Sequence, residues 1–120
     1  MIRVIVADAN IQTLLALTTM LRELPDLCLV GEADSADKLL EVAETNRADV
    51  IIVDRKLSGS STSTLLARLH SLEPRPFVIV MGYQVSHSRW ALSAGADAFV
   101  SKDDDAQWLV ESIYSYRGQQ

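Results

Sequence analysis

The 120-residue sequence lacks features that several classes of protein require. Its single cysteine, Cys28, excludes a disulfide framework and a cysteine-based zinc site, and the apolar surroundings of this residue predict a buried thiol. No apolar run approaches the roughly 20 residues that a membrane-spanning helix needs. The first residues also lack the layout of a signal peptide. We therefore expect a cytoplasmic protein with no membrane segment.

Positive charge is also scarce. The chain has 11 lysine and arginine residues against 16 aspartate and glutamate residues, which gives a net charge of -5. A surface that binds nucleic acid needs clustered lysine and arginine side chains to neutralise phosphates. The composition therefore predicts that this chain does not bind nucleic acid directly.

Short apolar runs of strand length alternate with stretches of helical period along the chain. The predicted strands are Ile2–Ala7, Cys28–Gly31, Val50–Val53, Phe77–Met81 and Ala98–Ser101. The first helical stretch repeats its apolar residues at Ile11, Leu14, Leu15, Thr18 and Leu21. Ser35 is the predicted N-cap of the second helix, and a loop at Ser58–Thr64 precedes the third. The fourth unit, Val85–Ala94, is the least regular and ends at Gly95.

Five strand–helix pairs predict one α/β domain over residues 1–120. Parallel strands joined by right-handed crossover helices form a three-layer, doubly wound sandwich, for which we expect the flavodoxin-like strand order 2-1-3-4-5. In such sheets, functional residues gather beyond the carboxyl ends of the strands. Asp8, Asp54 and Lys102 directly follow the first, third and fifth predicted strands. We therefore expect these three side chains to converge on one crevice.

The whole chain resembles a response-regulator receiver (CheY-like) domain, especially the receivers of helix-turn-helix transcription regulators. The matching stretches are IRVIVADAN, ADVIIVDRKLSG, RPFVIVMGY and AGADAFVSKD. The resemblance implies a two-component phosphorelay in which Asp54 is the phosphoacceptor, Asp8 a metal-associated acid and Lys102 a phosphate-pairing residue. It also implies Mg²⁺ as cofactor, with the backbone carbonyl of Lys56 as a further ligand.

Two departures from the family pattern affect this site. Family members carry two adjacent acids after the first strand, whereas Ala9 follows Asp8 here. Because carboxylates help to hold magnesium, we expect weakened binding of the ion without its exclusion. Met81 stands at the switch position, where the family has a hydroxyl that donates to the phosphoryl group, and a thioether is only a weak acceptor. We therefore predict slow self-phosphorylation and weak coupling of the site to the rest of the domain.

The last third of the chain contains four aromatic residues that are candidates for partner contacts or for core packing: Trp90, Phe99, Trp108 and Tyr114. In the family, the face made by the fourth helix, fifth strand and fifth helix carries dimer and partner contacts. The resemblance therefore implies a possible homodimer through this face and a histidine kinase or other signalling protein as partner. Phe99 occupies the position of the aromatic residue that changes rotamer on activation, and we expect its resting ring to pack in the core. The sequence leaves open whether a tryptophan is exposed.

The two histidines and two basic residues near Asp54 are expected to lie at the surface. His70 and His87 have no second metal ligand nearby in the sequence and are expected at the surface. For Arg55 and Lys56, exposed loop charge is favoured over a role in compensating the depleted site.

Three functional classes remain open. The first is a conventional phosphoacceptor at Asp54, and the second is a pseudo-receiver that signals through protein contacts without phosphorylation. The third is a flavin- or nucleotide-binding protein of the same fold, ranked last because the segment Asp8–Gln12 is no glycine-rich phosphate loop. In the first two classes the chain is a signalling domain and not an enzyme.

Overall fold

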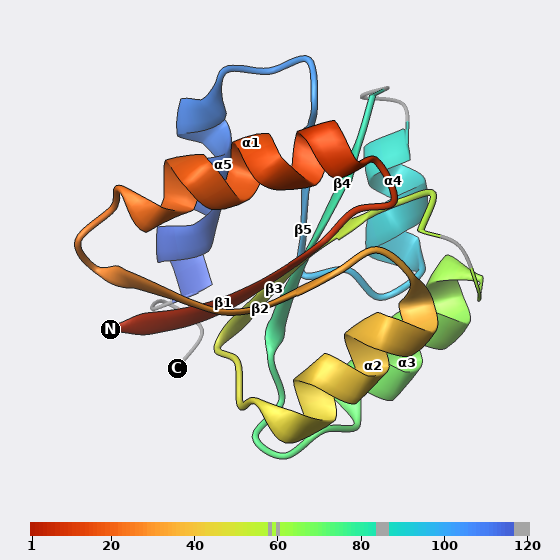
Figure 1. Cartoon of the computed structure of the whole chain (residues 1–120). Helices are drawn as coiled ribbons and strands as arrows, with labels where there is room; N and C mark the ends of the chain where they lie inside the picture. The colour runs from red at the N-terminus through yellow and green to blue at the C-terminus, as the bar shows by residue number, and fades with distance from the viewer. Residues whose placement is uncertain (58, 60, 84–86, 117–120) are drawn as a thin grey trace.

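The structure is a computed structural model that describes residues 1–57, 59, 61–83 and 87–116. Strands and helices alternate along the described chain, as the sequence predicts (Figure 1). In order, the elements are β1 (Ile2–Ala7), α1 (Ile11–Arg22), β2 (Leu27–Ala33), α2 (Ala36–Thr45), β3 (Val50–Asp54), α3 (Thr62–His70), β4 (Phe77–Gly82), α4 (His87–Ser93), β5 (Ala98–Ser101) and α5 (Ala106–Ser115).

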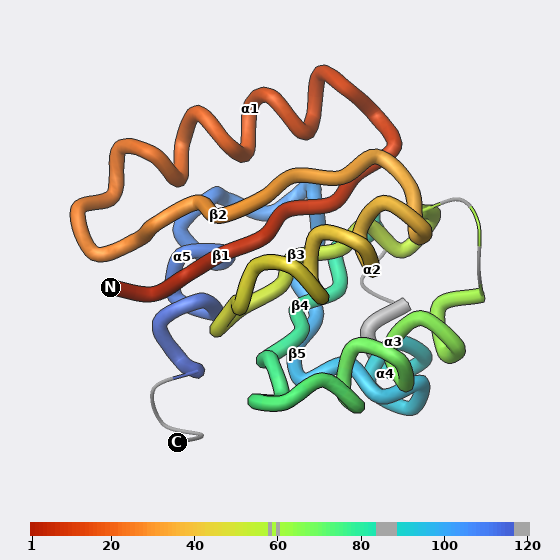
Figure 2. The backbone as a smooth tube through the Cα atoms, turned by 60° about the horizontal axis from the view of Figure 1, so that its bottom comes forward, coloured from red at the N-terminus to blue at the C-terminus, as the bar shows by residue number. Residues whose placement is uncertain are grey.

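The strands form one parallel sheet in the order β2-β1-β3-β4-β5. This confirms the predicted α/β fold and its strand order. Helices α1 and α5 cover one face of the sheet, while α2, α3 and α4 cover the other, so the molecule has three layers (Figures 1 and 2). The strand order reverses between β1 and β3, and the carboxyl ends of these neighbouring strands therefore flank a crevice.

Alternate residues of the central strands enter two separate hydrophobic cores. The core beneath α2, α3 and α4 takes Ile5, Ile51, Val53, Val78 and Val80 from the sheet. The core beneath α1 and α5 takes Val4, Val6, Val50, Ile52, Ile79 and Met81. Because both faces of the sheet are covered, every position of these strands favours an apolar side chain. This double burial explains why the strands appear in the sequence as continuous apolar runs.

Helix α1 buries a narrower face than its sequence spacing predicts. Leu14, Thr18 and Leu21 are buried, but Ile11 is 63% exposed and Leu15 is 62% exposed. The last two residues flank the buried strip, and a helix lying on a sheet covers only the side chains nearest the strands. Ile11 and Leu15 therefore share the helical spacing of the buried residues but form apolar surface at the start of α1.

Because β2 is an edge strand, it differs from the sequence prediction in its length and in the burial of Cys28. The strand extends beyond the predicted Cys28–Gly31 because it pairs with β1 from Leu27 to Ala33. The thiol of Cys28 is half-buried, and the prediction of a buried residue is wrong to that extent. An edge strand has a neighbour on one side only, so its side chains are less completely covered.

Serine caps set the starts of the next two helices. The Ser35 side chain accepts a hydrogen bond from the amide of Lys38 at 3.3 Å, which confirms the predicted N-cap. Ser61 caps α3 in the same way, by accepting from the amide of Thr64 at 3.3 Å. The predicted loop Ser58–Thr64 is therefore too long at its end, because Thr62 already begins α3. Residues 58 and 60 of that loop lie outside the described residues.

The irregular fourth unit contains the short helix α4. The described part of this unit begins at His87, so the predicted start at Val85 lies outside the described residues. Gly95 follows the helix with a φ of 115°, a left-handed conformation that glycine adopts without strain. None of the helices that the structure describes is long and apolar enough to cross a membrane.

Candidate functional site

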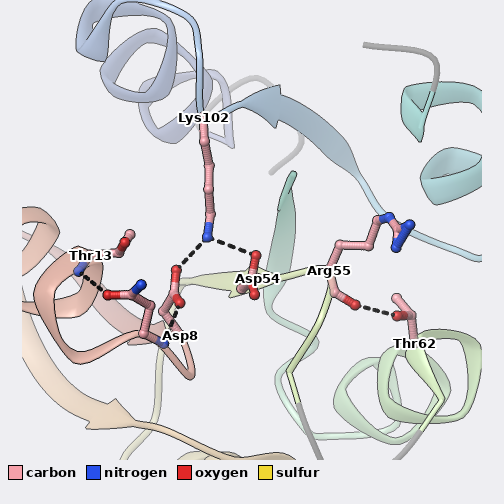
Figure 3. Close-up of polar contacts among 7 residues, drawn as sticks. Asp8, Thr13, Asp54, Arg55, Thr62 and Lys102 are labelled. Atoms are coloured by element: carbon pink, nitrogen blue, oxygen red, sulfur yellow. Dashed lines mark hydrogen bonds and ion pairs between the residues drawn. The ribbon is translucent and has the colours of Figure 1, made fainter. Parts of the chain in front are cut away.

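Three charged side chains meet where β1, β3 and β5 end (Figure 3). Asp8 directly follows β1, Asp54 is the last residue of β3, and Lys102 directly follows β5. The Nζ atom of Lys102 lies 2.8 Å from Asp8 Oδ2 and 2.8 Å from Asp54 Oδ1. The structure therefore brings together the three residues that the strand ends single out in the sequence.

The ion pairs of this triad are shielded from water. The exposed fractions of the side chains are 2% for Asp8, 12% for Asp54 and 8% for Lys102. Burial on its own would lower the pKa of Lys102, because it removes water from the ammonium group. Hydrogen bonds and charges from Asp54 and Asp8 outweigh this effect and raise the pKa above its ordinary value. Lys102 is therefore a fixed cation between two acids at neutral pH.

Backbone contacts and a helix cap hold Asp8 in place. Its amide donates to the carbonyl of Ala33 at 3.0 Å, and its Oδ1 accepts from the amide of Asn10 at 2.8 Å. The Asn10 side chain in turn caps α1 by accepting from the amide of Thr13 at 3.0 Å. Both carboxylate oxygens of Asp8 are thus engaged, one by Asn10 and the other by Lys102.

The end of β5 is tied to the end of β4 around Lys102. The amide of Lys102 donates to the carbonyl of Gly82 at 2.7 Å, and the Ser101 hydroxyl donates to the carbonyl of Tyr83 at 3.3 Å. The Lys102 ammonium also lies 5.3 Å from the centroid of the Tyr83 ring, within the range of a cation–π contact. These contacts fix the backbone from which the ammonium reaches the two acids.

The triad lines a small pocket of about 210 Å³. Its lining residues are Asp8, Ala9, Asn10, Asp54, Arg55, Lys56, Gly82, Tyr83 and Lys102. Sites for organic ligands of drug size measure roughly 300–1,000 Å³. The pocket is therefore suited to an ion or a group of phosphate size and is small for a flavin or a nucleotide.

The residues of the pocket fit a magnesium ion only in part. Asp8 and Asp54 supply carboxylates, whereas Ala9 presents a methyl group. Among the described residues, no group of three or more His, Cys, Asp or Glu side chains could hold a metal ion. Magnesium requires near-octahedral oxygen coordination, so water and the carbonyl of an exposed residue such as Lys56 would have to complete the set.

Met81 lies beside Asp54 in the sheet but outside the pocket lining. The two residues are register partners on β3 and β4. The Met81 side chain is 6% exposed and packs in the core beneath α1 and α5. The strand continues one residue past the predicted end, and Gly82 and Tyr83 line the pocket instead. Neither Met81 nor Gly82 has a side-chain hydroxyl.

Phe99 and Met81 lie on adjacent strands, as expected, but their side chains enter different cores. The register pairs Met81 with Val100 and Val80 with Phe99, and successive side chains of a strand point to opposite faces. Phe99 packs against the core beneath α2, α3 and α4, as expected for its resting ring. Its ring atoms lie 3.3 Å from the position that a Cβ on Gly82 would occupy. The ring therefore neighbours Gly82 and not Met81.

Arg55 differs from the exposed loop charge favoured by the sequence. Lys56 is exposed as expected, but Arg55 is partly buried, and its guanidinium carbon lies 5.3 Å from the centroid of the Trp90 ring. No local pattern indicates this contact, because Trp90 lies in α4, far along the chain from Arg55.

A second polar cluster lies near the starts of β4 and β5, at the end of the sheet opposite to the pocket. Asp97 Oδ2 lies 3.0 Å from His70 Nε2 and accepts from the amide of Val78 at 2.8 Å, while its Oδ1 accepts from Arg75 at 2.9 Å. The His70 side chain is only 16% exposed, so its predicted surface position is wrong. The side chain of His87 lies outside the described residues. Sequence reasoning missed Asp97, whose partners come from three different segments.

Comparisons with known proteins identify the family. Residues 4–114 match the family model of the response regulator receiver domain. The nitrate/nitrite response regulator protein NarL of Escherichia coli K12 is 29% identical over 92 residues, which are 75% of this chain and 43% of the relative. The response regulator GacA of Pseudomonas viridiflava is 29% identical over 117 residues, which are 94% of this chain and 54% of GacA. The chain spans about half the length of these relatives.

Solved structures share the fold. The signal receiver domain of NarL from Mycobacterium tuberculosis has a TM-score of 0.87 at 24% identity, with 98% of this chain and 97% of that chain covered. A chain from the complex of the CheA3 P1 domain with CheY6 of R. sphaeroides has a TM-score of 0.84 at 20% identity, with 98% and 97% covered. Since the family model covers nearly the whole chain, the protein belongs to the response regulator receiver domain family.

Proposed function

We propose that this receiver domain accepts a phosphoryl group on Asp54 from a histidine kinase in a two-component phosphorelay. The observation that carries the proposal is the position of the Lys102 ammonium, 2.8 Å from each of two shielded carboxylates. One Asp54 oxygen pairs with Lys102, and the other has no hydrogen bond or ion pair within the part of the chain that the structure describes. That second oxygen is the nucleophile that the proposal requires.

The proposed transfer is a displacement at phosphorus. The Asp54 oxygen forms a bond to phosphorus while the bond from phosphorus to the donor's imidazole nitrogen breaks, and the nitrogen keeps the electron pair. The product is an acyl phosphate on Asp54. Lys102 would pair with the oxygens of the phosphoryl group and offset the charge that they carry. On this proposal the chain is a signalling domain and not an enzyme.

Magnesium is a proposed but weakly held cofactor. Asp8, Asp54 and the backbone carbonyl of Lys56 would hold the ion, which would supply positive charge to the phosphoryl oxygens. Both oxygens of Asp8 already have partners, and Ala9 adds no carboxylate. The ion would therefore share Asp8 with Lys102, and this competition supports an affinity below that of a site with adjacent acids.

Intact mass measurement tests the acceptor role. The protein is incubated with a small phosphodonor and magnesium, and the expected product is heavier by one phosphoryl group. The matched Asp54→Asn variant should gain no mass, because its amide is not a nucleophile for this reaction. The proposal fails if the unmodified protein gains no mass, or if Asp54→Asn gains as much as the parent.

The second candidate is a pseudo-receiver that works through protein contacts without phosphorylation. Ala9 and Gly82 favour it, because at the pocket the first presents no carboxylate and the second no side-chain hydrogen-bond donor, while the Met81 side chain lies outside the pocket lining. In that case the domain holds one conformation. The mass measurement separates the two candidates, and amide spectra recorded with and without a phosphoryl mimic test for a single conformation. Widespread shifts through α4 and β5 would contradict the pseudo-receiver.

The face formed by α4, β5 and α5 is the proposed contact surface for a second copy or a signalling partner. Trp90 is 45% exposed, Leu92 is 50% exposed and Trp108 is 59% exposed, so both tryptophans left open by the sequence lie at the surface. Tyr114, in contrast, packs against the core beneath α1 and α5. Exposed tryptophan side chains are frequent anchors of protein interfaces. With a net charge of -5, we propose no direct contact of this domain with nucleic acid.

A further inference from the structure

A line of contacts leads from the residue after Asp54 to helix α4. The aliphatic part of Arg55 passes over Gly82, where its Cδ lies 3.6 Å from the position that a Cβ on Gly82 would take. Its guanidinium carbon then lies 5.3 Å from the centroid of the Trp90 ring. Figure 3 shows this side chain directed away from the carboxylate of Asp54. Arg55 thus leaves the pocket rim and reaches α4.

The backbone of Arg55 is fixed on both sides. Its amide donates to the carbonyl of Met81 at 2.8 Å, and its carbonyl accepts from the Thr62 hydroxyl at 3.1 Å. These bonds tie the residue to β4 and to the first residue of α3. These bonds fix the backbone of Arg55, so we expect any response of this residue to the pocket to be a change in the direction of its side chain.

Gly82 leaves the space that this side chain uses. The Phe99 ring lies on the same side of Gly82, 3.3 Å from the position of a Cβ there. Any side chain at residue 82 would therefore press on the ring and approach Arg55. The side chains of Arg55 and Phe99 thus meet at a position where the chain has only hydrogen.

We propose that Arg55 is a positioning residue that holds α4 through Trp90 and turns toward the Asp54 pocket when negative charge there increases. A guanidinium over a ring is held less strongly than a guanidinium that donates to phosphoryl or carboxylate oxygens in a shielded site. A phosphoryl group on Asp54 would therefore compete with Trp90 for Arg55. No serine or threonine hydroxyl is among the residues that line the pocket in the described part of the chain, so the family's usual coupling has no donor there, and Arg55 provides another route from the pocket to α4. That the added negative charge is a phosphoryl group on Asp54 rests on the proposed function.

The contact itself is tested first, without any phosphoryl group. Because the sequence has 2 tryptophans, Trp108→Phe leaves Trp90 as the single reporter. In that background, Arg55→Gln should shift the emission of Trp90 and increase its quenching by acrylamide, whereas Arg55→Lys should keep most of the protection. Far-ultraviolet circular dichroism checks that each variant is folded. Equal quenching in the parent and in folded Arg55→Gln would overturn the proposal.

The response to charge is tested next, because a merely structural contact would not show it. Lys102→Met removes the cation that offsets Asp54, and it should expose Trp90 as Arg55→Gln does. Adding Asp54→Asn to Lys102→Met should restore the protection, and adding Arg55→Gln should abolish the difference. If Lys102→Met does not fold, Ala9→Asp in metal-free buffer adds a carboxylate to the same pocket. A Trp90 signal that ignores these charges would reduce Arg55 to a packing contact and overturn the proposal.

A phosphodonor arm separates this inference from the proposed function. If mass measurement shows phosphorylation, Trp90 should become more accessible in the parent and not in Arg55→Gln. Phosphorylated protein with an unchanged Trp90 would overturn the coupling while the acceptor role stands. If no phosphoryl group is added, the proposed function fails, and the charge variants still decide whether Arg55 responds to the pocket.

Discussion

At the scale of single residues, the methyl group of Ala9 has the clearest chemical consequence. Ala9→Asp should strengthen magnesium binding on the order of tenfold, because a carboxylate ligand for a cation is worth at least one charge-assisted hydrogen bond. Titration of the amide signals around Asp54 with magnesium measures both affinities. Ala9→Asn is the matched control, since it has similar size but no charge. Equal affinities for the parent and Ala9→Asp would show that the missing acid does not limit binding.

Gly82 supports a second prediction at this scale. Gly82→Ala should lower the free energy of unfolding by about 1 kcal/mol, the low end of the cost of overpacking a core. The new methyl group would lie 3.3 Å from the Phe99 ring, so the ring has to shift by a few tenths of an ångström. Urea unfolding measures the loss. Phe99→Leu should remove most of the cost, and a full penalty in the double variant would mean that the strain lies elsewhere.

The charged residues at the strand ends could be predicted from the sequence, whereas the side-chain contacts around the pocket could not. Asp8, Asp54 and Lys102 could be placed together because each follows a recognisable strand, and parallel strands end at one edge. The position of Arg55 could not, because it depends on a side-chain direction and on the empty space at Gly82. The neighbours of Phe99 likewise depend on the register between β4 and β5, which composition does not reveal.

At the scale of elements, the Asp97 cluster joins the end of α3 to the start of β4. Burial alone would raise the pKa of Asp97, but the hydrogen bonds from the Val78 amide, Arg75 and His70, with the charge of His70, lower it. A carboxylate whose pKa is lowered in the folded state stabilises that state above its unfolded pKa. This contribution is lost as the pH falls through the lower, folded value.

Asp97→Asn should therefore destabilise the domain by about 2 kcal/mol near neutral pH, in the range of hydrogen bonds to a charged group. The difference between parent and variant should shrink as the pH falls below the ordinary aspartate pKa of 3.8. Urea unfolding over a pH series measures this difference, and effects shared by other acids cancel in the comparison. A difference that stays constant with pH would show that shape and not charge makes Asp97 stabilising.

Element boundaries show the same limit of sequence reasoning. The five strands could be found because burial on both faces makes them continuous apolar runs. The length of β2 is set by its pairing with β1, and the buried face of α1 is set by how the helix lies on the sheet. Ile11 and Leu15 have the spacing of core residues, yet their exposure depends on that tertiary placement and not on periodicity.

At the scale of the whole molecule, association through the α4, β5 and α5 face is the testable consequence of its exposed aromatic residues. Phe99, Asp104, Trp108 and Glu111 contribute to a surface hollow of about 320 Å³. We expect sedimentation to show dimers that form with rising protein concentration. Trp108→Ser should weaken them on the order of tenfold or more, as for a tryptophan anchor. Leu15→Ser, on α1, is the control and should leave association unchanged; an equal loss in both variants would place the contact elsewhere.

Strand β4 is held at both of its ends by the two polar clusters. Near its start, the amide of Val78 donates to the Asp97 carboxylate at 2.8 Å, and at its end the carbonyl of Gly82 accepts from the backbone amide of Lys102 at 2.7 Å. Local unfolding at one end of β4 leaves the strand attached to the polar cluster at its other end. In addition, β3 and β5 pair with β4 on its two sides. Only unfolding of the entire domain should therefore free its backbone. In native-state deuterium exchange, the amides of β4 should be the slowest of the chain, with opening free energies equal to that of global unfolding; faster exchange in β4 than in β1 would disprove this.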